Sequence, residues 1–365
     1  MSNMENIETV ETVETVEKDI LGGNTPRVYD EQGREILVDA KNVKQWFPIK
    51  KWIFEKQRYV KAVDDVDVHM YRGETLGVCG ESGCGKSTLM RTILQLLTPT
   101  AGSIKYEGIE ITKLKRKQLK KIREHMQIVF QDPYSALDPR MKVGAILEEP
   151  LIINRPDMDK KARLARVREL MTQVGLDASY INRYPHEFSG GQRQRIVIAR
   201  ALASYPEVLF CDEAVSALDV SVRAQILNLL EELQDELKLT YMFVSHDLSV
   251  IEHICDRIVI MYLGKVVEVG TKDDIFKNPK HPYTQALLSA IPLVGKKKTE
   301  RIILEGDIPS PVNPPSGCRF HTRCPYATER CTTEVPEMVD LGGEHRAACH
   351  LCAPEVAEEA PAEAV

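Results

Sequence analysis

The sequence of 365 residues contains no apolar run long enough to cross a membrane. One of the longest, residues 286–294, is interrupted by Ser289 and Pro292. The first residues lack the basic and then apolar order of a secretory signal peptide. The net charge is −6, so no broad basic surface is expected for nucleic acid. These absences favour a cytoplasmic protein that binds no nucleic acid, with enough residues for two or three domains.

The cysteines are few and odd in number, and they fall into two groups. Of the nine, four lie scattered in apolar or glycine-rich stretches and are interpreted as reduced packing residues, namely Cys79, Cys84, Cys211 and Cys255. The other five lie near the C-terminus: Cys318, Cys324, Cys331 and Cys349, spaced C-x5-C-x6-C-x17-C, and Cys352. Converging thiolates suggest a soft-metal site, but this spacing matches neither zinc ribbons nor bacterial ferredoxins. Incidental thiols in a loop-rich tail are the alternative, and the spacing alone leaves both open.

Residues 80–88, GESGCGKST, fit the phosphate-binding pattern G-x-x-x-x-G-K-[ST]. Its glycines allow backbone angles that turn successive N–H groups toward one anion. An apolar strand is expected before it and a helix after it, so the loop would end at a helix N-terminus, where phosphate is favoured. Lys86 supplies a positive charge and the Ser87 hydroxyl a ligand for Mg²⁺. The expected nucleotide-binding residues here are Gly80, Ser82, Gly83, Cys84, Gly85, Lys86, Ser87 and Thr88.

The two ends of the chain are acidic and lack structural signals. Residues 1–24 carry Glu-Thr-Val repeats and no aromatics, and residues 1–35 are predicted to be a disordered tail, as are residues 353–365. A folded domain is expected to start at residue 36, with an alternating strand at 62–68. Tyr59, just before that strand, either stacks on an adenine ring or is an ordinary edge-strand tyrosine.

A helical insertion and a second glycine-bearing helix start are predicted in the middle of the chain. The apolar strand 126–130 ends at Gln131, and in a doubly wound sheet ligands bind at such carboxyl ends. Helical spacing follows and predicts an inserted subdomain at about 132–200. Within it, residues 188–192 read FSGGQ, and Ser189 would cap a helix N-terminus, which makes a second anion site. A chain that acts alone needs only one anion site of this kind.

Two further apolar strands end in polar residues. The strand 208–212 ends in Asp212, which is placed to hold Mg²⁺, and Glu213 follows, able to accept a proton from an attacking water. Two exposed acids at a strand end are the alternative, which the phosphate loop disfavours. The strand 241–245 places His246 at its tip. A lone histidine is usually structural, but this one is well placed to reach a γ-phosphate.

Taken in order, these motifs resemble the nucleotide-binding subunit of ATP-binding-cassette (ABC) transporters, and more closely the oligopeptide and dipeptide permease ATPases. The closer resemblance rests on FQDPYSALDPRM (130–141), YPHEFSGGQRQRI (184–196), SALDVSVRAQ (216–225), HPYTQALLSAIP (281–292) and GCRFHTRCPYA (317–327). It implies an α/β P-loop NTPase (RecA-like) core with an antiparallel β subdomain, the inserted helical subdomain and a small Cys-rich C-terminal module. The cassette would occupy residues 36–290 and the module residues 291–352.

The resemblance also implies roles for the matching residues. Two cassettes would pair head to tail, so that ATP lies between one phosphate loop and the partner's motif of Ser189, Gly190, Gly191 and Gln192. Asp219 would bridge the subunits. Glu213 would polarise the water, His246 would steady the γ-phosphate, and Gln131 would join Ser87 and Asp212 around Mg²⁺. This sequence departs from the family at Ala214, commonly proline, and at Phe188, usually leucine; neither removes a charge or a hydrogen-bonding group.

The C-terminal module of the family implies a 4Fe-4S cluster on Cys318, Cys324, Cys331 and Cys349, with Arg319, His321 and Arg323 offsetting its negative charge. Since the module lies far along the chain from the ATP motifs, no direct part in hydrolysis is expected. The implied partners are a second ATPase subunit, identical or a sister chain, and two permease subunits, with an extracellular solute-binding protein acting indirectly. The chain would lie at the cytoplasmic face of the cell membrane.

The favoured function is therefore an ATPase subunit that powers an importer of oligopeptides or dipeptides. A soluble cassette ATPase of translation or DNA repair is the main rival; such proteins usually carry two cassettes or a coiled coil, and this sequence has one cassette and no heptads. A metal-regulated protein with a degenerate ATPase is disfavoured because the motif residues are all present. The solute stays open, and nickel chelates are one alternative to peptides.

Overall fold

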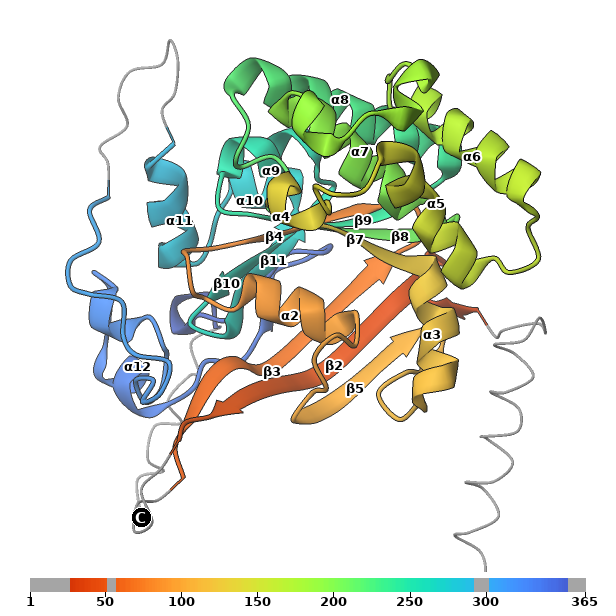
Figure 1. Cartoon of the computed structure of the whole chain (residues 1–365). Helices are drawn as coiled ribbons and strands as arrows, with labels where there is room; N and C mark the ends of the chain where they lie inside the picture. The colour runs from red at the N-terminus through yellow and green to blue at the C-terminus, as the bar shows by residue number, and fades with distance from the viewer. Residues whose placement is uncertain (1–26, 51–56, 292–301, 354–365) are drawn as a thin grey trace, which may run out of the picture.

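The computed structural model describes residues 27–50, 57–291 and 302–353, and a mixed eight-stranded sheet forms its centre (Figure 1). Five neighbouring strands are parallel, in the spatial order β7 (Met126–Val129), β8 (Val208–Asp212), β9 (Thr240–Ser245), β4 (Thr75–Cys79) and β10 (Arg257–Tyr262). Antiparallel strands β11 (Lys265–Thr271), β13 (Arg346–Ala347) and β12 (Val339–Asp340) continue the sheet. The strands β4, β8, β9 and β10 are buried throughout, as expected for a parallel sheet covered on both faces.

A second, antiparallel sheet lies below the first in Figure 1, with helix α2 (Lys86–Ile93) between them. Its strands are β1 (Val28–Tyr29), β2 (Glu35–Pro48), β3 (Tyr59–Tyr71), β5 (Ala101–Tyr106) and β6 (Ile109–Glu110). Strand β1 pairs with the start of β2, so the folded part begins before residue 36 and the tail boundary predicted at residue 35 is too late. Residues 1–26 of the predicted tail lie outside the described residues, as do residues 354–365.

Two apolar cores form because successive side chains of a strand point to opposite faces. In β8, Phe210 packs toward α2 and the antiparallel sheet, whereas Leu209 and Cys211 pack toward the helices on the other face. Strand β9 alternates in the same way, with Met242 on the α2 side and Phe243 on the other. Each of these strands therefore packs against α2 and the antiparallel sheet on one face and against the helices on the other. Packing on both faces fixes the positions of the strand ends.

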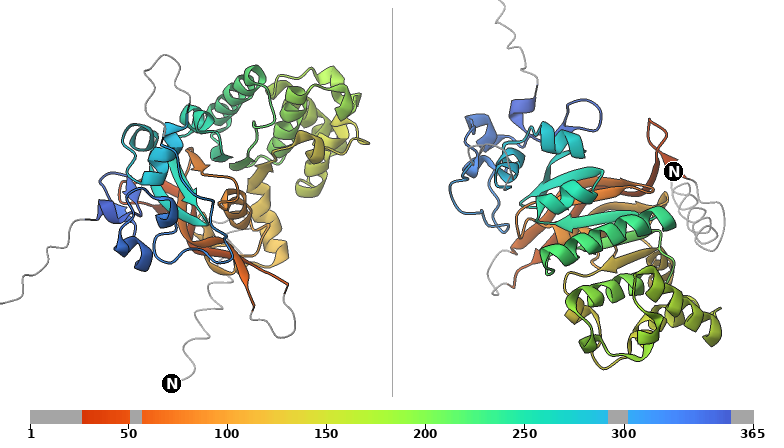
Figure 2. Two further views of the ribbon diagram at one scale, coloured as in Figure 1. Left: turned by 90° about the vertical axis from the view of Figure 1, so that its left-hand side faces the viewer. Right: turned by 90° about the horizontal axis from the view of Figure 1, so that it is seen from above.

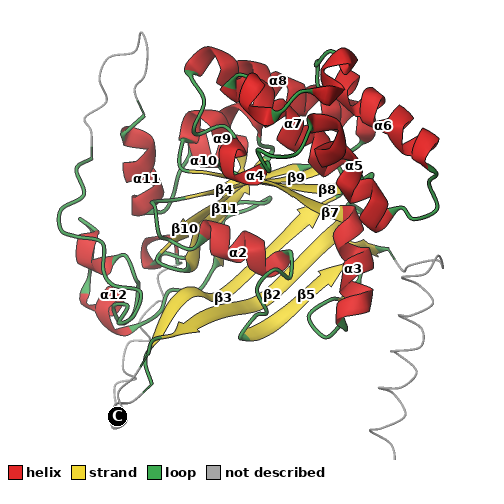
Figure 3. Ribbon diagram, in the orientation of Figure 1, coloured by secondary structure: helices red, strands yellow, loops and turns green. Residues whose placement is uncertain are grey.

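The helices on the other face form a lobe to one side of the sheet (Figures 1 and 2). The lobe consists of α4 (Pro133–Ala136), α5 (Val143–Asn154), α6 (Lys160–Gln173) and α7 (Gly190–Leu202), with short 3-10 turns at Ala178–Asn182 and Pro185–Glu187. Three further helices cover the sheet, namely α8 (Val220–Leu237), α9 (Leu248–Ile254) and α10 (Lys272–Lys277), and α3 (Arg116–His125) precedes β7. In Figure 3 the lobe consists of helices joined by loops, in contrast to the strands that it borders.

The C-terminal region lies on the opposite side of the sheet from the helical lobe (Figure 2). It contains α11 (Pro282–Ser289), α12 (Glu329–Thr333) and 3-10 turns at His321–Arg323 and His350–Cys352. It is not a separate module, because β12 and β13 extend the central sheet and Phe320 is buried between Tyr262 and Tyr283. Among the described helices, none has both the length and the apolar character needed to span a bilayer.

Candidate functional site

The loop 80–88 connects β4 to the N-terminus of α2, as the sequence predicted. Gly80 and Gly85 have φ angles of 148° and 108°, in a region that other residues rarely adopt. A Cβ atom at Gly80 would lie 2.2 Å from the Met261 carbonyl oxygen, and one at Gly85 would lie 2.1 Å from that of Ala62. Both positions therefore require glycine, and the loop backbone fits tightly against β3 and β10.

Polar groups suited to a metal–triphosphate meet at this loop. Lys86 is buried, and its Nζ donates to the carbonyl oxygens of Gly80 at 2.7 Å and Glu81 at 3.0 Å. The Ser87 hydroxyl donates to Asp212 Oδ1 at 2.6 Å, and Arg91 donates to Asp212 Oδ2 at 3.1 Å. A hydroxyl and a carboxylate in contact supply hard oxygen ligands of the kind that Mg²⁺ takes.

The three residues predicted to be catalytic form one polar group around Glu213. Gln131 Nε2 donates to Glu213 Oε2 at 3.0 Å, and His246 Nδ1 lies 3.1 Å from Glu213 Oε1. They follow the neighbouring parallel strands β7, β8 and β9, whose carboxyl ends share one edge of the sheet. Glu213 has a φ of 49°, which is rare for a residue with a side chain, and strain of this kind concentrates at functional sites.

Tyr59 begins β3, three residues before the Ala62 carbonyl that contacts the phosphate loop. Its ring is half exposed, and its centroid lies 6.1 Å from that of Trp46. The Lys61 ammonium lies over the same Trp46 ring, 5.0 Å from its centroid. The stacking role and the edge-strand alternative therefore both stay predictions.

The second predicted anion site is the capped start of α7. Ser189 and Gln192 form a capping box, in which the Ser189 N–H donates to Gln192 Oε1 at 3.0 Å and the Gln192 N–H donates to Ser189 Oγ at 3.3 Å. Gly191 is needed for close packing, since a Cβ there would lie 2.4 Å from Val222 of α8. Within the described residues, no hydrogen bond joins this turn to the loop 80–88.

Asp219 and the two residues that depart from the family pattern, Phe188 and Ala214, lie in ordinary structural positions. Asp219 caps α8 and is exposed; a hydrogen bond from the Val222 N–H lowers the pKa of its carboxyl. Phe188 is buried and packs edge-on against Tyr180, 6.0 Å away, so its larger ring is accommodated inside the helical lobe. Ala214 is buried directly after Glu213.

Four of the five C-terminal cysteines line one small cavity: Cys318, Cys324, Cys331 and Cys349. Its volume of about 10 Å³ has room for a single water. Among the described residues, no three or more His, Cys, Asp or Glu side chains form a group that could hold a metal ion. Burial raises the pKa of Cys318 to about 11 and also raises that of Cys324 and Cys349, so these thiols are protonated at neutral pH.

The C-terminal region contacts the phosphate loop, although about 240 residues of sequence separate them. Arg323 donates to both Glu81 carboxylate oxygens, at 2.8 and 3.2 Å. Arg319 bonds the Asp64 carboxylate and the Leu263 carbonyl oxygen. These two arginines therefore pair with carboxylates of the cassette. The family resemblance had implied instead that they offset the charge of an iron–sulfur cluster. The C-terminal region thus lies close in space to the phosphate loop, and the expectation that it takes no direct part in hydrolysis stays a prediction.

Comparisons with known proteins agree with this geometry. Residues 63–216 match the family described as ABC transporter, and residues 267–331 match the family described as oligopeptide/dipeptide transporter, C-terminal region. The chain is 53% identical to the dipeptide transport ATP-binding protein DppF of Escherichia coli, over 84% of this chain and 92% of that protein. It is 51% identical to the oligopeptide transport ATP-binding protein AppF of Bacillus subtilis, over 87% and 98% respectively.

Solved structures give the same result. The dimeric structure of MJ0796, a bacterial ABC transporter cassette, matches with a TM-score of 0.57 and 32% identity, over 64% of this chain and 98% of that one. CbiO1 of Clostridium perfringens, part of the transporter complex cbiONQ, matches with a TM-score of 0.58 and 26% identity, over 67% and 91%. The chain is similar in structure to both cassettes, and it is about half identical to the two curated relatives over most of their length. This similarity excludes a P-loop protein of another family. The chain belongs to the ATP-binding proteins of oligopeptide/dipeptide ABC transporters and is an ATPase of the ABC type.

Proposed function

We propose that this chain binds and hydrolyses ATP to power an importer of oligopeptides or dipeptides. The observation that carries the proposal is the joint presence of a complete cassette and the C-terminal region of oligopeptide/dipeptide transporters in one chain. By sequence we assign residues 36–290 to the cassette, with the helical subdomain at about 132–200, and residues 291–352 to the C-terminal region. Strand β1, which precedes residue 36, pairs with β2 of the cassette, and α11, which precedes residue 291, is grouped with the C-terminal region. The soluble ATPase of translation or DNA repair has no comparable support.

The loop 80–88 would hold the phosphates of ATP. The glycine-lined backbone and the α2 N-terminus suit an anion, and Lys86 is held beside them. Ser87 and Asp212, which already contact one another, would hold Mg²⁺ together with Gln131. When bound, Mg²⁺ would offset the negative charge of the phosphates. Glu213 would accept the proton of the attacking water, His246 would steady the γ-phosphate, and Tyr59 would stack on the base.

The motif at 189–192 would act on ATP held by a second ATPase subunit. It has the exposed, capped helix start that binds anions but no bond to the loop 80–88 of its own chain. The similar cassette MJ0796 is described as dimeric and, in one structure, as bound to ADP and Pi. Gly190, Gly191 and Asp219 would complete this contact between the subunits.

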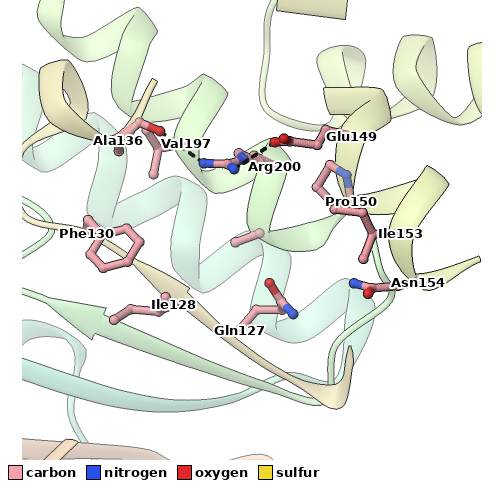
Figure 4. Close-up of a pocket in the computed structure, with 11 residues that line it drawn as sticks. Gln127, Ile128, Phe130, Ala136, Glu149, Pro150, Ile153, Asn154, Val197 and Arg200 are labelled. Atoms are coloured by element: carbon pink, nitrogen blue, oxygen red, sulfur yellow. Dashed lines mark hydrogen bonds and ion pairs between the residues drawn. The ribbon is translucent and has the colours of Figure 1, made fainter. Parts of the chain in front are cut away.

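A groove between β7 and the helical lobe is the proposed contact with the permease (Figure 4). It measures about 290 Å³. Its apolar side chains come from β7 and the residue after it, from α4, and from α5 and α7: Ile128, Phe130, Ala136, Pro150, Ile153, Val197 and Ala201. Arg200 crosses it and bonds Glu149 at 2.9 Å and the Ala136 carbonyl oxygen at 3.0 Å. An apolar groove with a polar rim suits a short amphipathic helix of a membrane subunit. Phe130 precedes Gln131, so the groove adjoins the ATP site.

Peptide uptake into vesicles that hold the permease and this subunit tests both the function and the groove. Ile153→Asp puts a charge on a half-exposed groove residue, and we expect it to lower ATP-driven uptake at least tenfold while the ATPase activity of the isolated chain stays within twofold. Leu164→Asp, at an exposed site of the same lobe outside the groove, is the matched control. Wild-type vesicles that take up no peptide would contradict the proposed function, and normal uptake by Ile153→Asp would contradict the groove.

We further propose that the cysteine-lined cavity holds a 4Fe-4S cluster. The support is the kind and number of donors: Cys318, Cys324, Cys331 and Cys349 supply four thiols around one space, which Cys352 does not line. In their described positions they do not form a metal-holding group. His281 also lines the cavity. Its Nδ1 accepts a hydrogen bond from the Tyr283 N–H, so the ring proton lies on Nε2. Nε2 is buried and has no hydrogen-bond partner among the described residues. Burial lowers the pKa of His281 to about 4, which keeps the ring neutral. The thiols would have to move outward, because the cavity as it stands fits one water.

Protein purified without oxygen is expected to be brown and to contain iron and sulfide in near-equal amounts. Substituting any one of the four cavity cysteines by Ser should remove the colour, because a cluster of this type needs four thiolates. Cys352→Ser is the matched control and should keep it. Zinc without iron, or no metal, in anaerobic preparations would refute the cluster.

A further inference from the structure

The C-terminal region holds Glu81, the second residue of the phosphate loop, by its side chain. The Arg323 guanidinium makes a two-point contact with the Glu81 carboxylate, at 2.8 and 3.2 Å. The exposed fraction is 8% for the Arg323 side chain and 24% for that of Glu81, so water screens this pair only in part. A guanidinium is always protonated in proteins, so this contact is a charged pair.

The same residue is also held by its backbone. The Glu81 N–H donates to the Tyr283 hydroxyl at 2.8 Å, and the Glu81 carbonyl oxygen accepts from Lys86 Nζ at 3.0 Å. Tyr283 is fully buried on α11, with its ring centroid 4.7 Å from that of Tyr262 and 5.4 Å from that of Phe320. Glu81 thus joins the aromatic cluster of Tyr262, Tyr283 and Phe320 to the lysine of the phosphate loop.

We infer that Arg323 and Tyr283 are positioning residues for the phosphate loop, and that through them the C-terminal region sets the affinity for MgATP. The inference rests on the proposed phosphate-binding role of residues 80–88. Arg323 neutralises a carboxylate that belongs to the same loop as the phosphate-binding N–H groups and would otherwise repel a triphosphate. Tyr283 fixes the direction of the loop where it leaves β4.

The position of Arg323 depends on the cysteine-lined cavity. Its 3-10 turn, His321–Arg323, lies between Cys318 and Cys324, which both line that cavity. The Arg323 N–H donates to the Phe320 carbonyl oxygen at 2.9 Å, and His321 Nδ1 lies 2.8 Å from the Cys318 carbonyl oxygen. The turn that faces the cavity on one side therefore carries, on the other, the contact with the phosphate loop.

The alternative is that Arg323 only attaches the C-terminal region to the cassette and has no effect on the phosphate loop. Arg319 provides the matched control for this alternative. Arg319 lies in the same segment and makes a similar part-buried pair with Asp64 of the cassette, but it makes no bond to residues 80–88 among those described. If these arginines only attach the C-terminal region, Arg319→Gln and Arg323→Gln should behave alike.

Fluorescence titration of the full-length chain with a labelled ATP and Mg²⁺ tests the inference. We expect Arg323→Gln to raise Kd about tenfold at low salt and less at high salt, because it leaves the Glu81 charge unpaired. The double variant with Glu81→Gln should return to within about threefold of wild type, while Arg319→Gln keeps the wild-type Kd. The kcat at saturating ATP should change less than twofold for Arg323→Gln, because only binding is affected.

Tyr283→Phe tests the same inference if Arg323→Gln does not fold, because this substitution removes only a hydroxyl group. It should raise Kd severalfold relative to Tyr241→Phe, which removes a buried hydroxyl that, among the described residues, bonds the Leu230 carbonyl oxygen alone. Wild-type Kd values for Arg323→Gln and Tyr283→Phe, or a double variant as weak as Arg323→Gln, would overturn the inference. Failure of the proposed site is distinct: wild-type chain and Lys86→Ala would then bind MgATP equally.

Discussion

Glu213→Gln is expected to lower ATP turnover by about 10²–10⁴-fold while MgATP affinity stays within a few-fold of wild type. The amide keeps the size of the carboxylate and can still meet Gln131 and His246, but it cannot take a proton from water. Because the Glu213 backbone is fixed by an N–H bond of 2.9 Å to the Val244 carbonyl oxygen, the substitution should not move the chain. Phosphate release by the purified chain, in parallel with nucleotide titration, measures both quantities.

The control for this prediction is Glu252→Gln, which removes one carboxylate from the exposed surface of α9. It should hydrolyse ATP at the wild-type rate. Turnover by Glu213→Gln within about threefold of wild type would exclude Glu213 as the base. A parallel loss of affinity would instead assign it to ground-state binding.

ATP is expected to convert the Glu213→Gln chain into a dimer, and Ser189→Glu is expected to prevent this completely. Slow hydrolysis preserves the nucleotide that joins the two subunits, so the dimer should accumulate. Ser189→Glu places a negative charge at a helix start that would otherwise meet the partner's γ-phosphate. Light scattering with and without MgATP, in the Glu213→Gln background, measures the change.

Ser179→Glu adds the same charge to an exposed serine of the helical lobe outside the motif and should dimerise normally. A chain that stays monomeric at every ATP concentration, alone and with any sister subunit, would contradict the paired site. So would a Ser189→Glu chain that dimerises as readily as Ser179→Glu.

The core of the ATP site could be predicted from sequence because each part is local. The loop 80–88 needs only its own glycines and the strand and helix around it. Gln131, Glu213 and His246 each follow an apolar strand, and parallel strands bring their carboxyl ends to one edge. The structure adds the order of β7, β8 and β9, which brings three separate strand ends into one polar group.

Contacts across the chain could not be predicted in this way. The pair of Arg323 and Glu81 depends on how the C-terminal region folds back, and neither residue carries a local signal for the other. The two-residue strand β1 is defined by its pairing with β2, which composition does not reveal, so composition placed it in the tail. The gathering of four cysteines was expected from the family resemblance, whereas their spacing in the chain left it open.

The structure of the Glu213→Gln chain with MgATP, in the form that dimerises, tests the central claim most directly. Each ATP is predicted to lie between residues 80–88 of one subunit and Ser189, Gly190 and Gly191 of the other. Ser87 and Asp212 should lie at the metal, and Glu213→Gln beside the γ-phosphate. An ATP enclosed by one chain alone, with both 189–192 motifs left in solvent, would contradict the account.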